Sequence, residues 1–335
     1  REACMKAVLV TGGAGYIGSH TLRVLASRGY APTCIDNLST GFREFVGDVP
    51  LIEGDLGDPF ALEEAFSRAP IEAVIHFASL ANVEESVKNP SRYYHDNILN
   101  CLNLLSALRS HGVRYVVFSS TAATYGIPHL VPIAESAPLA PINPYGVTKM
   151  VLEHMLADYA KAYGLRFVSL RYFNAAGAAP DGTLGEWHTP ETHLIPRLLD
   201  VACGRGKSAE IYGNDYPTLD GTCVRDYIHV NDLAVAHAAA LDFLFAGNAS
   251  NTFNLGTGEG HTVLEVVREV ARTTGADLPY EFKPRRPGDP PALIADPAKA
   301  QAILGWQAEH SNLREIVETA WSWHRKRSAA SQPRS

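Results

Sequence analysis

Short runs of apolar residues recur through the first half of the chain, each about five residues long. They are rich in Val, Ile and Phe and alternate little with polar residues, as is typical of strands buried on both faces. Amphipathic stretches between them predict helices, and strands alternating with helices indicate an α/β protein with a Rossmann-type doubly wound parallel sheet. The expected strands are Lys6–Thr11, Thr33–Asp36, Leu51–Gly54, Ala73–Phe77, Tyr115–Ser119 and Phe167–Arg171, and the expected helices are Ile17–Arg28, Phe60–Arg68, Ser91–His111 and Tyr145–Tyr163.

The regular alternation stops after about Ala175. Ala176–His193 is rich in Gly, Pro and polar residues, and Ala209–Cys223 is loop-like. We therefore expect a larger domain of residues 5–175 and 225–257 and a smaller, discontinuous lobe of residues 176–224 and 258–327 over the carboxyl ends of the sheet. The remaining expected elements are a strand at Arg225–Val230, a helix at Asn231–Phe245, a strand at Thr252–Leu255, a helix–strand–helix stretch from Val263 onward and a frayed tail at Lys326–Ser335.

Composition and charge describe an ordinary globular protein. Its 335 residues are 46% apolar and 19% charged. This length is enough for about two lobes, or for one large α/β domain with an appendage. The formal charge of −7 argues against nucleic acid or an anionic membrane as partner. Five cysteines, without a Cys-x-x-Cys pair, indicate a reducing cytoplasm rather than a disulfide framework. Arg1–Lys6 leads into a strand rather than a signal peptide, so we take Met5 as the start and leave Arg1–Cys4 out.

A glycine-rich segment, Thr11-Gly12-Gly13-Ala14-Gly15-Tyr16-Ile17-Gly18, follows the first expected strand and opens the first expected helix. Gly12 permits a tight turn, Gly15 lets the helix N-terminus approach a pyrophosphate, and Gly18 lets the helix pack close to the sheet. Asp36, at the end of the second strand, is placed to accept hydrogen bonds from ribose hydroxyls and to repel a 2′-phosphate. NAD is therefore favoured over NADP, and Arg43, close by in sequence, is the feature that favours NADP.

Further candidate cofactor contacts follow the third and fourth strands. Asp55-Leu56 is placed to contact the edge of an adenine ring, and Phe77-Ala78-Ser79 is placed to lie beside the pyrophosphate. A helix N-cap is an equally good interpretation of Asp55.

Tyr145-Gly146-Val147-Thr148-Lys149 begins an expected helix, on which residues four apart share a face. A phenol alone is a poor base at neutral pH, but a neighbouring ammonium lowers its pKa. Upstream, the strand ending in Ser119-Ser120-Thr121 points its carboxyl end at the position where parallel sheets bind ligands. We therefore expect Tyr145 and Lys149 to act together, with Thr121 bridging a substrate hydroxyl to Tyr145.

The chain resembles the extended short-chain dehydrogenase/reductase family, whose signature pairs TGxxGxxG with YxxxK, and within it the UDP-glucose 4-epimerases. The resemblance runs from Lys6 to about His324. GEWHTPETHLIP (Gly185–Pro196) is further similar to the branch that supplies bacterial exopolysaccharide synthesis and to related plant pentose epimerases. The other matching segments are TGGAGYIGSHT (Thr11–Thr21), DNLS (Asp36–Ser39), VIHFA (Val74–Ala78), FSSTAATYG (Phe118–Gly126), NPYGVTK (Asn143–Lys149), LRYFNAAGA (Leu170–Ala178), GNDYPTLDGTCVRDYIHV (Gly213–Val230), NLGTG (Asn254–Gly258) and PRRPGDPPA (Pro284–Ala292).

The resemblance implies interconversion of UDP-glucose and UDP-galactose through a transient 4-keto sugar, with NAD kept bound through turnover. It implies Tyr145 as acid/base, Lys149 as its electrostatic partner and Thr121 as the proton relay. Arg225 and Arg286 also follow from charge, because an acidic protein needs forked cations to hold a diphosphate. The implied NAD contacts are Gly12, Gly15, Tyr16, Ile17, Gly18, Asp36, Asn37, Asp55, Leu56, Phe77, Ala78, Asn97, Ser119, Tyr145, Lys149 and Phe173. The implied UDP-sugar contacts are Thr121, Asn174, Leu194, Ile211, Tyr212, Arg225, Tyr227, Arg286, Asp289 and Leu293.

Some positions depart from the family pattern. Ala81 replaces a lysine near the nicotinamide, and His193 replaces an asparagine on the uracil side. Where many family members have Asn-Asn after a Tyr-Tyr pair, this chain has His95-Asp96-Asn97. We expect Asn97 to keep its contact with the cofactor, whereas Asp96 puts the contact of the other asparagine in doubt. Leu293 stands where other epimerases have a tyrosine or a smaller residue. These departures concern the sugar pair, which stays open between UDP-glucose/galactose, their N-acetyl forms and UDP-xylose/arabinose, as does the pathway.

Three other functions compete: a nucleotide-sugar dehydratase or decarboxylase of the same fold, a net dehydrogenase and a non-catalytic NAD sensor. Dehydratases of this fold place an Asp-Glu pair after the residue that matches Thr121, where this chain has Ala122 and Ala123. A net dehydrogenase would release reduced cofactor, and a non-catalytic NAD sensor would be expected to lack Tyr145 or Lys149.

Other chemistry-bearing residues give weaker signals. His20 and His76 are expected to be core histidines. Asp181, Glu186, His188, Glu191 and His193 suggest a metal, but no helical spacing holds them, so we expect none. The expected helices Asn97–His111 and Tyr145–Tyr163 carry broad apolar faces, which include Leu99, Leu102, Val151 and Met155. Because the resemblance implies that such helices pair across a two-fold axis into a four-helix bundle, we expect a homodimer.

Overall fold

A computed structural model describes residues 5–286 and 288–330, with side chains to residue 327. The expected extension Arg1–Cys4 and residues 331–335 of the expected tail lie outside this range. Residues 326–330, expected to fray, instead continue the last helix, α12 (Leu313–Ala330). None of the described helices has the length and apolar character needed to cross a membrane.

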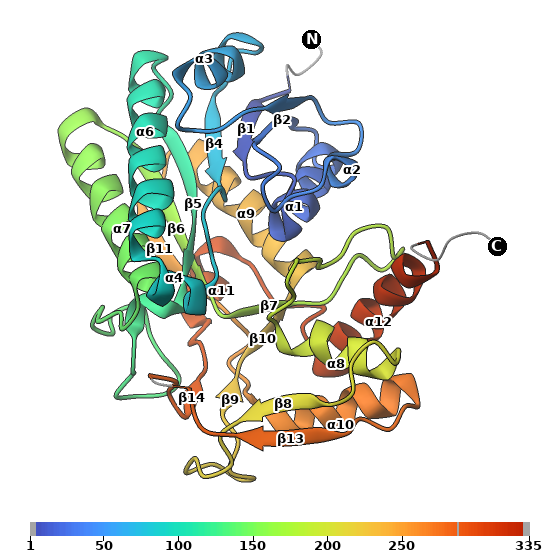
Figure 1. The fold of residues 1–335 in the computed structure, drawn as a ribbon. Helices are drawn as coiled ribbons and strands as arrows, with labels where there is room; N and C mark the ends of the chain where they lie inside the picture. The colour runs from blue at the N-terminus through green and yellow to red at the C-terminus, as the bar shows by residue number, and fades with distance from the viewer. Residues whose placement is uncertain (1–4, 287, 331–335) are drawn as a thin grey trace.

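Seven parallel strands form the central sheet in the order β11-β6-β5-β4-β1-β2-β3 (Figure 1). Their apolar runs are buried along most of their length, as strands covered on both faces require. This confirms the expected doubly wound architecture. The strands are β1 (Ala7–Thr11), β2 (Ala31–Asp36), β3 (Leu51–Glu53), β4 (Ala73–His76), β5 (Tyr115–Thr121), β6 (Arg166–Tyr172) and β11 (Asn251–Leu255).

Two layers of helices cover the sheet, each with its own apolar core. One core packs α1 (Tyr16–Ser27), α9 (Val230–Phe245) and α11 (Ala298–Leu304) against the sheet. The other packs α3 (Pro59–Ser67), α6 (Asn100–Ser110) and α7 (Pro144–Tyr163) against the opposite face. Figure 1 shows α6 and α7 side by side on the face away from α1 and α9.

The remaining chain builds smaller sheets beside a third apolar core. That core joins α8 (Leu194–Ala202), α10 (Val263–Thr274) and α12, which lie at the lower right of Figure 1. Three small sheets accompany it: β7 (Asn174–Ala176) with β10 (Tyr227–His229); β9 (Val224–Arg225) between β12 (His261–Thr262) and β14 (Ala292–Leu293); and β8 (Ala209–Tyr212) with β13 (Tyr280–Lys283).

Three sequence expectations were wrong in detail. The expected strand Arg225–Val230 is divided into β9 and β10, which belong to different sheets, and Val230 begins α9. The segment Ala209–Cys223, expected to be loop-like, begins with the strand β8. Its partner strand, β13, lies far along the chain, so the local sequence does not indicate the pairing. The expected continuous helix Ser91–His111 is α5 (Pro90–Tyr93), a π-helical segment η1 (Tyr94–Leu99) and then α6. π-Helical turns are frequent at functional sites, and η1 carries Asp96 and Asn97. The other described elements are α2 (Arg43–Val46), α4 (Val83–Lys88) and η2 (Ala122–Tyr125).

A buried ion pair fixes α7 to the sheet. The guanidinium of Arg171 on β6 donates from Nε to Glu153 Oε1 at 2.9 Å and forms a second contact from its terminal nitrogen to Glu153 Oε2. Ser120 Oγ on β5 donates to the same carboxylate at 2.5 Å, and Arg171 also donates to Tyr125 Oη at 2.9 Å. The Arg171 and Glu153 side chains are only 7% and 8% exposed. The pair therefore fixes how α7 lies against the strand ends.

We expect Glu153→Gln to lower the free energy of unfolding by about 3–5 kcal/mol, because it leaves the Arg171 charge buried without its counterion. Urea denaturation measures the loss. Glu64→Gln, which breaks the half-exposed i,i+4 pair with Arg68, is the matched control and should cost at most about 0.5 kcal/mol. Equal losses in both variants would show that the buried pair does not hold the helix.

Candidate active site

The glycine turn after β1 has the backbone geometry expected of it. Gly12 has φ +73, and a Cβ there would lie 2.6 Å from Ala78 N. A Cβ on Gly18 would lie 2.3 Å from Gly12 O, so only glycine lets α1 approach the turn this closely. Gly15 caps α1 without a side-chain hydrogen bond and has only Gly12 O within contact range of an added Cβ, at 3.4 Å. The helix N-terminus is therefore free of a capping side chain, as anion binding requires.

Asp36 at the end of β2 is tied to this turn. Its carboxylate accepts the Ala14 N–H and the Leu38 N–H, both at 2.9 Å. Burial raises the pKa of Asp36, and the two backbone N–H groups oppose that rise. Each oxygen keeps a further lone pair, because a carboxylate has about four acceptor positions. The carboxylate therefore both fixes the turn and can accept ligand hydroxyls.

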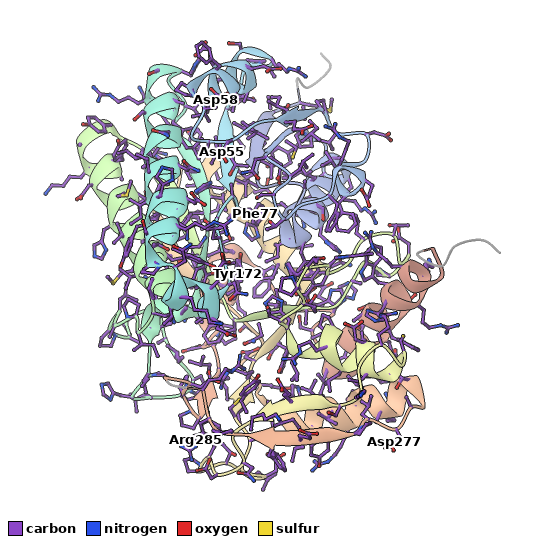
Figure 2. All side chains as sticks on the ribbon, in the orientation of Figure 1. Asp55, Asp58, Phe77, Tyr172, Asp277 and Arg285 are labelled. Atoms are coloured by element: carbon purple, nitrogen blue, oxygen red, sulfur yellow. The ribbon has the colours of Figure 1, made fainter. Side chains whose placement is uncertain are left out.

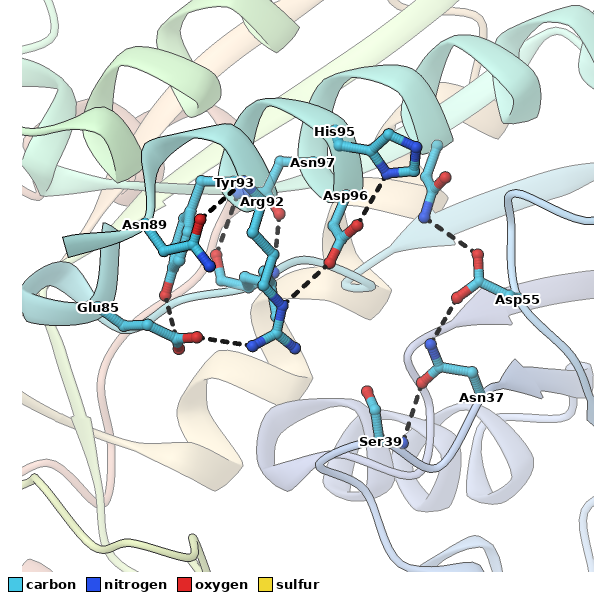
Figure 3. Close-up of polar contacts among 12 residues, drawn as sticks. Asn37, Ser39, Asp55, Glu85, Asn89, Arg92, Tyr93, His95, Asp96 and Asn97 are labelled. Carbon is cyan, nitrogen blue, oxygen red and sulfur yellow. Dashed lines mark hydrogen bonds and ion pairs between the residues drawn. The ribbon is translucent and has the colours of Figure 1, made fainter. Parts of the chain in front are cut away.

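Asp55 is not a helix N-cap. Asp58 caps α3 by accepting the Phe60 N–H, whereas Asp55 accepts hydrogen bonds from Asn37 Nδ2 at 2.6 Å and Asn100 Nδ2 at 3.2 Å (Figure 3). The capping interpretation of Asp55 is therefore wrong, and its contact with the cofactor stays a prediction. In Figure 2 the side chains of Asp55, Phe77 and Tyr172 follow one another down the middle of the molecule.

Asn97 and Asp96 on η1 point to different partners. Asn97 is fully buried, accepts the Leu80 N–H at 2.8 Å and donates to Leu80 O and Thr148 Oγ1. Both of its amide hydrogens are thus used within the protein, where they fix the strand end to α7. Asp96 is held by Arg92 and His95 (Figure 3).

Tyr145 and Lys149 meet at the start of α7. Asn143 caps this helix by accepting the Gly146 N–H at 2.8 Å, and Pro144 occupies its first turn. Tyr145 Oη is hydrogen-bonded to the Thr121 hydroxyl, and the Lys149 ammonium lies 6.0 Å from the Tyr145 ring centre. The structure therefore brings together the three residues that the sequence predicts to carry the chemistry.

Burial dominates the electrostatics of this pair. Burial raises the pKa of Tyr145, which the Thr121 hydrogen bond partly offsets. Burial lowers the pKa of Lys149 to about 7. Its ammonium donates to Ser79 Oγ at 2.9 Å and to Ser119 O at 2.8 Å. A charged Lys149 about 6 Å away would favour the tyrosinate by about 3 kcal/mol at an effective dielectric of about 20. The charge of Lys149 therefore controls how readily Tyr145 ionises.

Sequence reasoning missed Tyr172, whose hydroxyl bonds Ser119 Oγ beside this pair. The signal was one residue away, in the LRYFN segment. His20 and His76 are core residues as expected. Burial lowers the pKa of His20 to about 4 and that of His76 to about 3, and their Nδ1 atoms bond Tyr16 O and Thr11 Oγ1.

A second polar group forms in the small β9 sheet. Arg225 is buried and donates to Asp289 Oδ1 at 3.0 Å and to Pro290 O at 3.0 Å. Arg286 pairs with Asp289 Oδ2 at 3.4 Å, stacks on Tyr212 and is 57% exposed. These contacts bring together four of the residues predicted to bind the UDP-sugar, including the two arginines expected to hold its diphosphate. Forked cations of this kind suit its oxygens.

The other predicted substrate residues are distributed around this group. Asn174 pairs with Tyr227 across β7 and β10, and Leu194 begins α8. The Ile211 and Tyr227 side chains are buried in the third core, so Ile211 can face a ligand only with its backbone. Leu293 pairs with Arg225 in register and packs partly against the cluster that contains Phe173 and Ala122.

Among the remaining predicted cofactor residues, Leu56 and Phe173 are buried, and Ile17, Phe77 and Ala78 are partly buried beside the sheet. The Tyr16 hydroxyl donates to Gly177 O at 2.6 Å, away from the turn that its backbone helps to form. Four of the five residues weighed as metal ligands come together in one loop, namely Glu186, His188, Glu191 and His193. Asp181 pairs with Arg23 instead. A loop conformation thus supplies the proximity that helical spacing does not.

Comparison with known proteins adds the family. The model of the NAD dependent epimerase/dehydratase family matches residues 8–256. A UDP-glucose 4-epimerase of Rhizobium leguminosarum bv. trifolii is 50% identical over 319 residues, which cover 95% of this chain and 97% of the relative.

Solved structures agree over the same length. The UDP-glucose 4-epimerase from Brucella ovis in complex with NAD has a TM-score of 0.92 and 52% identity, covering 94% of this chain and 97% of that one. The enzyme from Stenotrophomonas maltophila with bound NAD and formylated UDP-arabinopyranose has a TM-score of 0.94 and 41% identity, covering 98% and 100%.

The low pKa of Lys149 makes stability depend on pH. Between its folded pKa of about 7 and its ordinary value of 10.5, the unfolded chain binds the proton that the folded protein has lost. Stability should therefore rise with pH across this window. We expect ligand-free wild type to gain up to about 1.4 kcal/mol per pH unit relative to Lys149→Met between pH 7 and 9. Urea denaturation at each pH measures the difference. Parallel curves for the two proteins would contradict the lowered pKa.

Proposed function

The chain belongs to the NAD dependent epimerase/dehydratase family, and we propose that it is a UDP-glucose 4-epimerase that interconverts UDP-glucose and UDP-galactose with NAD as cofactor. The observation that carries the chemistry is the Tyr145–Thr121 hydrogen bond beside the buried Lys149 ammonium. This contact lies at the carboxyl end of a parallel sheet, where ligands of such folds bind, and so supports an acid/base role for Tyr145.

The residues at the glycine turn fit NAD. The uncapped N-terminus of α1 suits the pyrophosphate, and the buried Asp36 carboxylate suits the adenosine ribose while repelling a 2′-phosphate. Arg43, which could favour NADP, pairs with Glu53. NAD bound at this turn would supply a reversible hydride acceptor for C4 of the sugar.

The protein's own task is to move the hydroxyl proton and hold the nucleotide. Tyr145, as tyrosinate, accepts the proton of the 4-hydroxyl, with Thr121 orienting or relaying it, and returns it when the carbonyl is reduced. Lys149 stabilises the tyrosinate. Arg225 and Arg286 hold the diphosphate, so the keto sugar can turn its other face while the UDP part stays bound.

Elimination is not supported by the residues after Thr121. Ala122 and Ala123 open η2, and the Ala123 N–H donates to Thr121 Oγ1 at 3.1 Å. Neither side chain can act as acid or base where a dehydratase needs both. The chemistry therefore stops at the ketone and reverses.

We also propose a cytoplasmic homodimer. The described cysteines Cys34, Cys101, Cys203 and Cys223 are unpaired, which suits a reducing compartment. Leu99 and Leu102, at the junction of η1 and α6, are 43% and 40% exposed, and a second copy would cover them. The division into residues 5–175 with 225–257 for NAD, and 176–224 with 258–327 for UDP-sugar, likewise stays a proposal.

Tyr145→Phe should lower turnover of UDP-galactose about 10²–10⁴-fold, because it removes the hydroxyl that transfers the proton. Bound NAD should remain, since the glycine turn is untouched. Product analysis without added cofactor, with absorbance of released NAD, measures both effects. Tyr159→Phe, on the same helix, is the control and should retain wild-type turnover. Near-normal activity of Tyr145→Phe at neutral pH would refute the assignment.

Leu293→Tyr tests the sugar preference. Its position beside Arg225 and next to a cluster that includes Ala122 supports the proposal that Leu293 forms a wall near the sugar. We expect wild type to act mainly on UDP-glucose and UDP-galactose, with measurable turnover of UDP-N-acetylglucosamine. A tyrosine would fill the space of the N-acetyl group and lower turnover of that sugar about 10–200-fold.

Leu293→Met preserves the volume and is the control, expected to leave both activities near wild type. Product analysis with each UDP-sugar gives the comparison. Equal losses on both sugars in Leu293→Tyr, or a wild type inert toward the N-acetyl sugar, would mean that Leu293 only packs beneath the lobe.

A further inference from the structure

The loop between β7 and α8 gathers two imidazoles and two carboxylates. Glu186, His188, Glu191 and His193 each offer one nitrogen or oxygen ligand atom, and these atoms all lie within 4.8 Å of one another. None of the four takes part in the chemistry proposed above.

Several nitrogen–oxygen distances within this group are close to the spacing of two ligands on one zinc ion, with Glu191 facing the two histidines through different oxygens. His188 Nδ1 lies 3.5 Å from Glu186 Oε1 and 3.6 Å from Glu191 Oε2, and His193 Nδ1 lies 3.4 Å from Glu191 Oε1. Zn²⁺ with ligands at about 2.0–2.2 Å sets its ligand atoms about 3.4 Å apart. The remaining contact, from His193 Nδ1 to Glu186 Oε1, is 2.7 Å. It would lengthen by about 0.7 Å to admit the ion.

One nitrogen in the group has no other use. His188 Nδ1 is buried and makes no hydrogen bond, although two carboxylate oxygens lie within 3.6 Å. A buried imidazole nitrogen of this kind normally finds a donor or an acceptor. A cation between it and the carboxylates would supply the missing partner.

The carboxylates are buried and fixed in place. The Glu186 and Glu191 side chains are only 7% and 14% exposed, and two anions so close together are costly unless paired or bound to metal. The Thr192 and His193 N–H groups donate to Glu191 Oε1 at 2.8 and 2.9 Å. The other carboxylate oxygen, Glu191 Oε2, faces His188 Nδ1. Trp323 Nε1 donates to Glu186 O at 3.0 Å and thereby ties the loop to α12.

We propose that Glu186, His188, Glu191 and His193 form a structural Zn²⁺ site. Two imidazoles favour zinc over Mg²⁺ or Ca²⁺, which prefer all-oxygen sites, and four protein ligands leave no open position for catalysis. The ion fixes the loop directly before Leu194, the first residue of α8. This assignment replaces our sequence expectation of no metal, because the loop supplies the proximity that helical spacing does not.

Zinc binding to the chelator-treated, NAD-loaded protein tests the site. Titration of Zn²⁺ against a chromogenic chelator should show one tightly bound ion per chain. Thermal unfolding with and without Zn²⁺ should show that the ion raises the Tm. Co²⁺ in its place should give the intense visible absorption of tetrahedral coordination. His188→Ala and Glu191→Gln should each weaken Zn²⁺ binding at least about tenfold and abolish the Tm gain.

His111→Ala is the matched control, because that imidazole faces a single carboxylate, Glu63, at 3.0 Å. It should bind Zn²⁺ as wild type does. The site would be overturned if wild type bound Zn²⁺ weakly and no better than His188→Ala. The group would then be a metal-free cluster in which a protonated His193 bridges the two carboxylates. Retention of NAD by each variant shows that it is folded. The binding readout does not depend on epimerase activity.

Discussion

The burial of the Lys149 ammonium is the constraint on which the site depends. A lysine with 2% exposure stays charged only where fixed acceptors replace water, and here they come from two strand ends, as Ser79 Oγ after β4 and Ser119 O on β5. The parallel sheet makes this possible, because it brings the carboxyl ends of successive strands to one edge. Lys149 is thus held where its charge acts on Tyr145.

Several other contacts hold this geometry. Asn143 sets the start of α7, Asn97 fixes Thr148 to the strand end after β4, and the Glu153–Arg171 pair fixes the next turn of the helix to β5 and β6. The buried Asp226, next to Arg225, accepts the Thr257, Gly258 and Ala295 N–H groups and so joins the residues proposed to hold the diphosphate to the end of β11. The residues proposed to transfer the proton and those proposed to hold the nucleotide are therefore anchored to the same sheet.

Local signals carried most of the prediction. Apolar runs identified the strands of the central sheet to within about two residues, and the glycine turn, Asp36 and the Tyr145–Lys149 spacing could be interpreted because each depends on neighbours a few residues away. Features with distant partners gave no such signal. β8 pairs with β13, Arg171 forms an ion pair with Glu153, and Tyr172 is hydrogen-bonded to Ser119, and each partner lies far away in the sequence. The His188–His193 cluster depends on the path of a loop. The π-helical segment η1 replaced a predicted regular helix because periodicity does not distinguish the two.

The most direct test of the account follows the hydrogen at C4 of the sugar. In the proposed chemistry Tyr145 and Thr121 handle only the hydroxyl proton, so the C4 hydrogen never becomes exchangeable with water. UDP-glucose converted by the purified protein in D₂O, without added cofactor, should give UDP-galactose that carries protium at C4 by NMR. Deuterium at C4 would mean that a protein base removes that hydrogen as a proton, which would contradict the account.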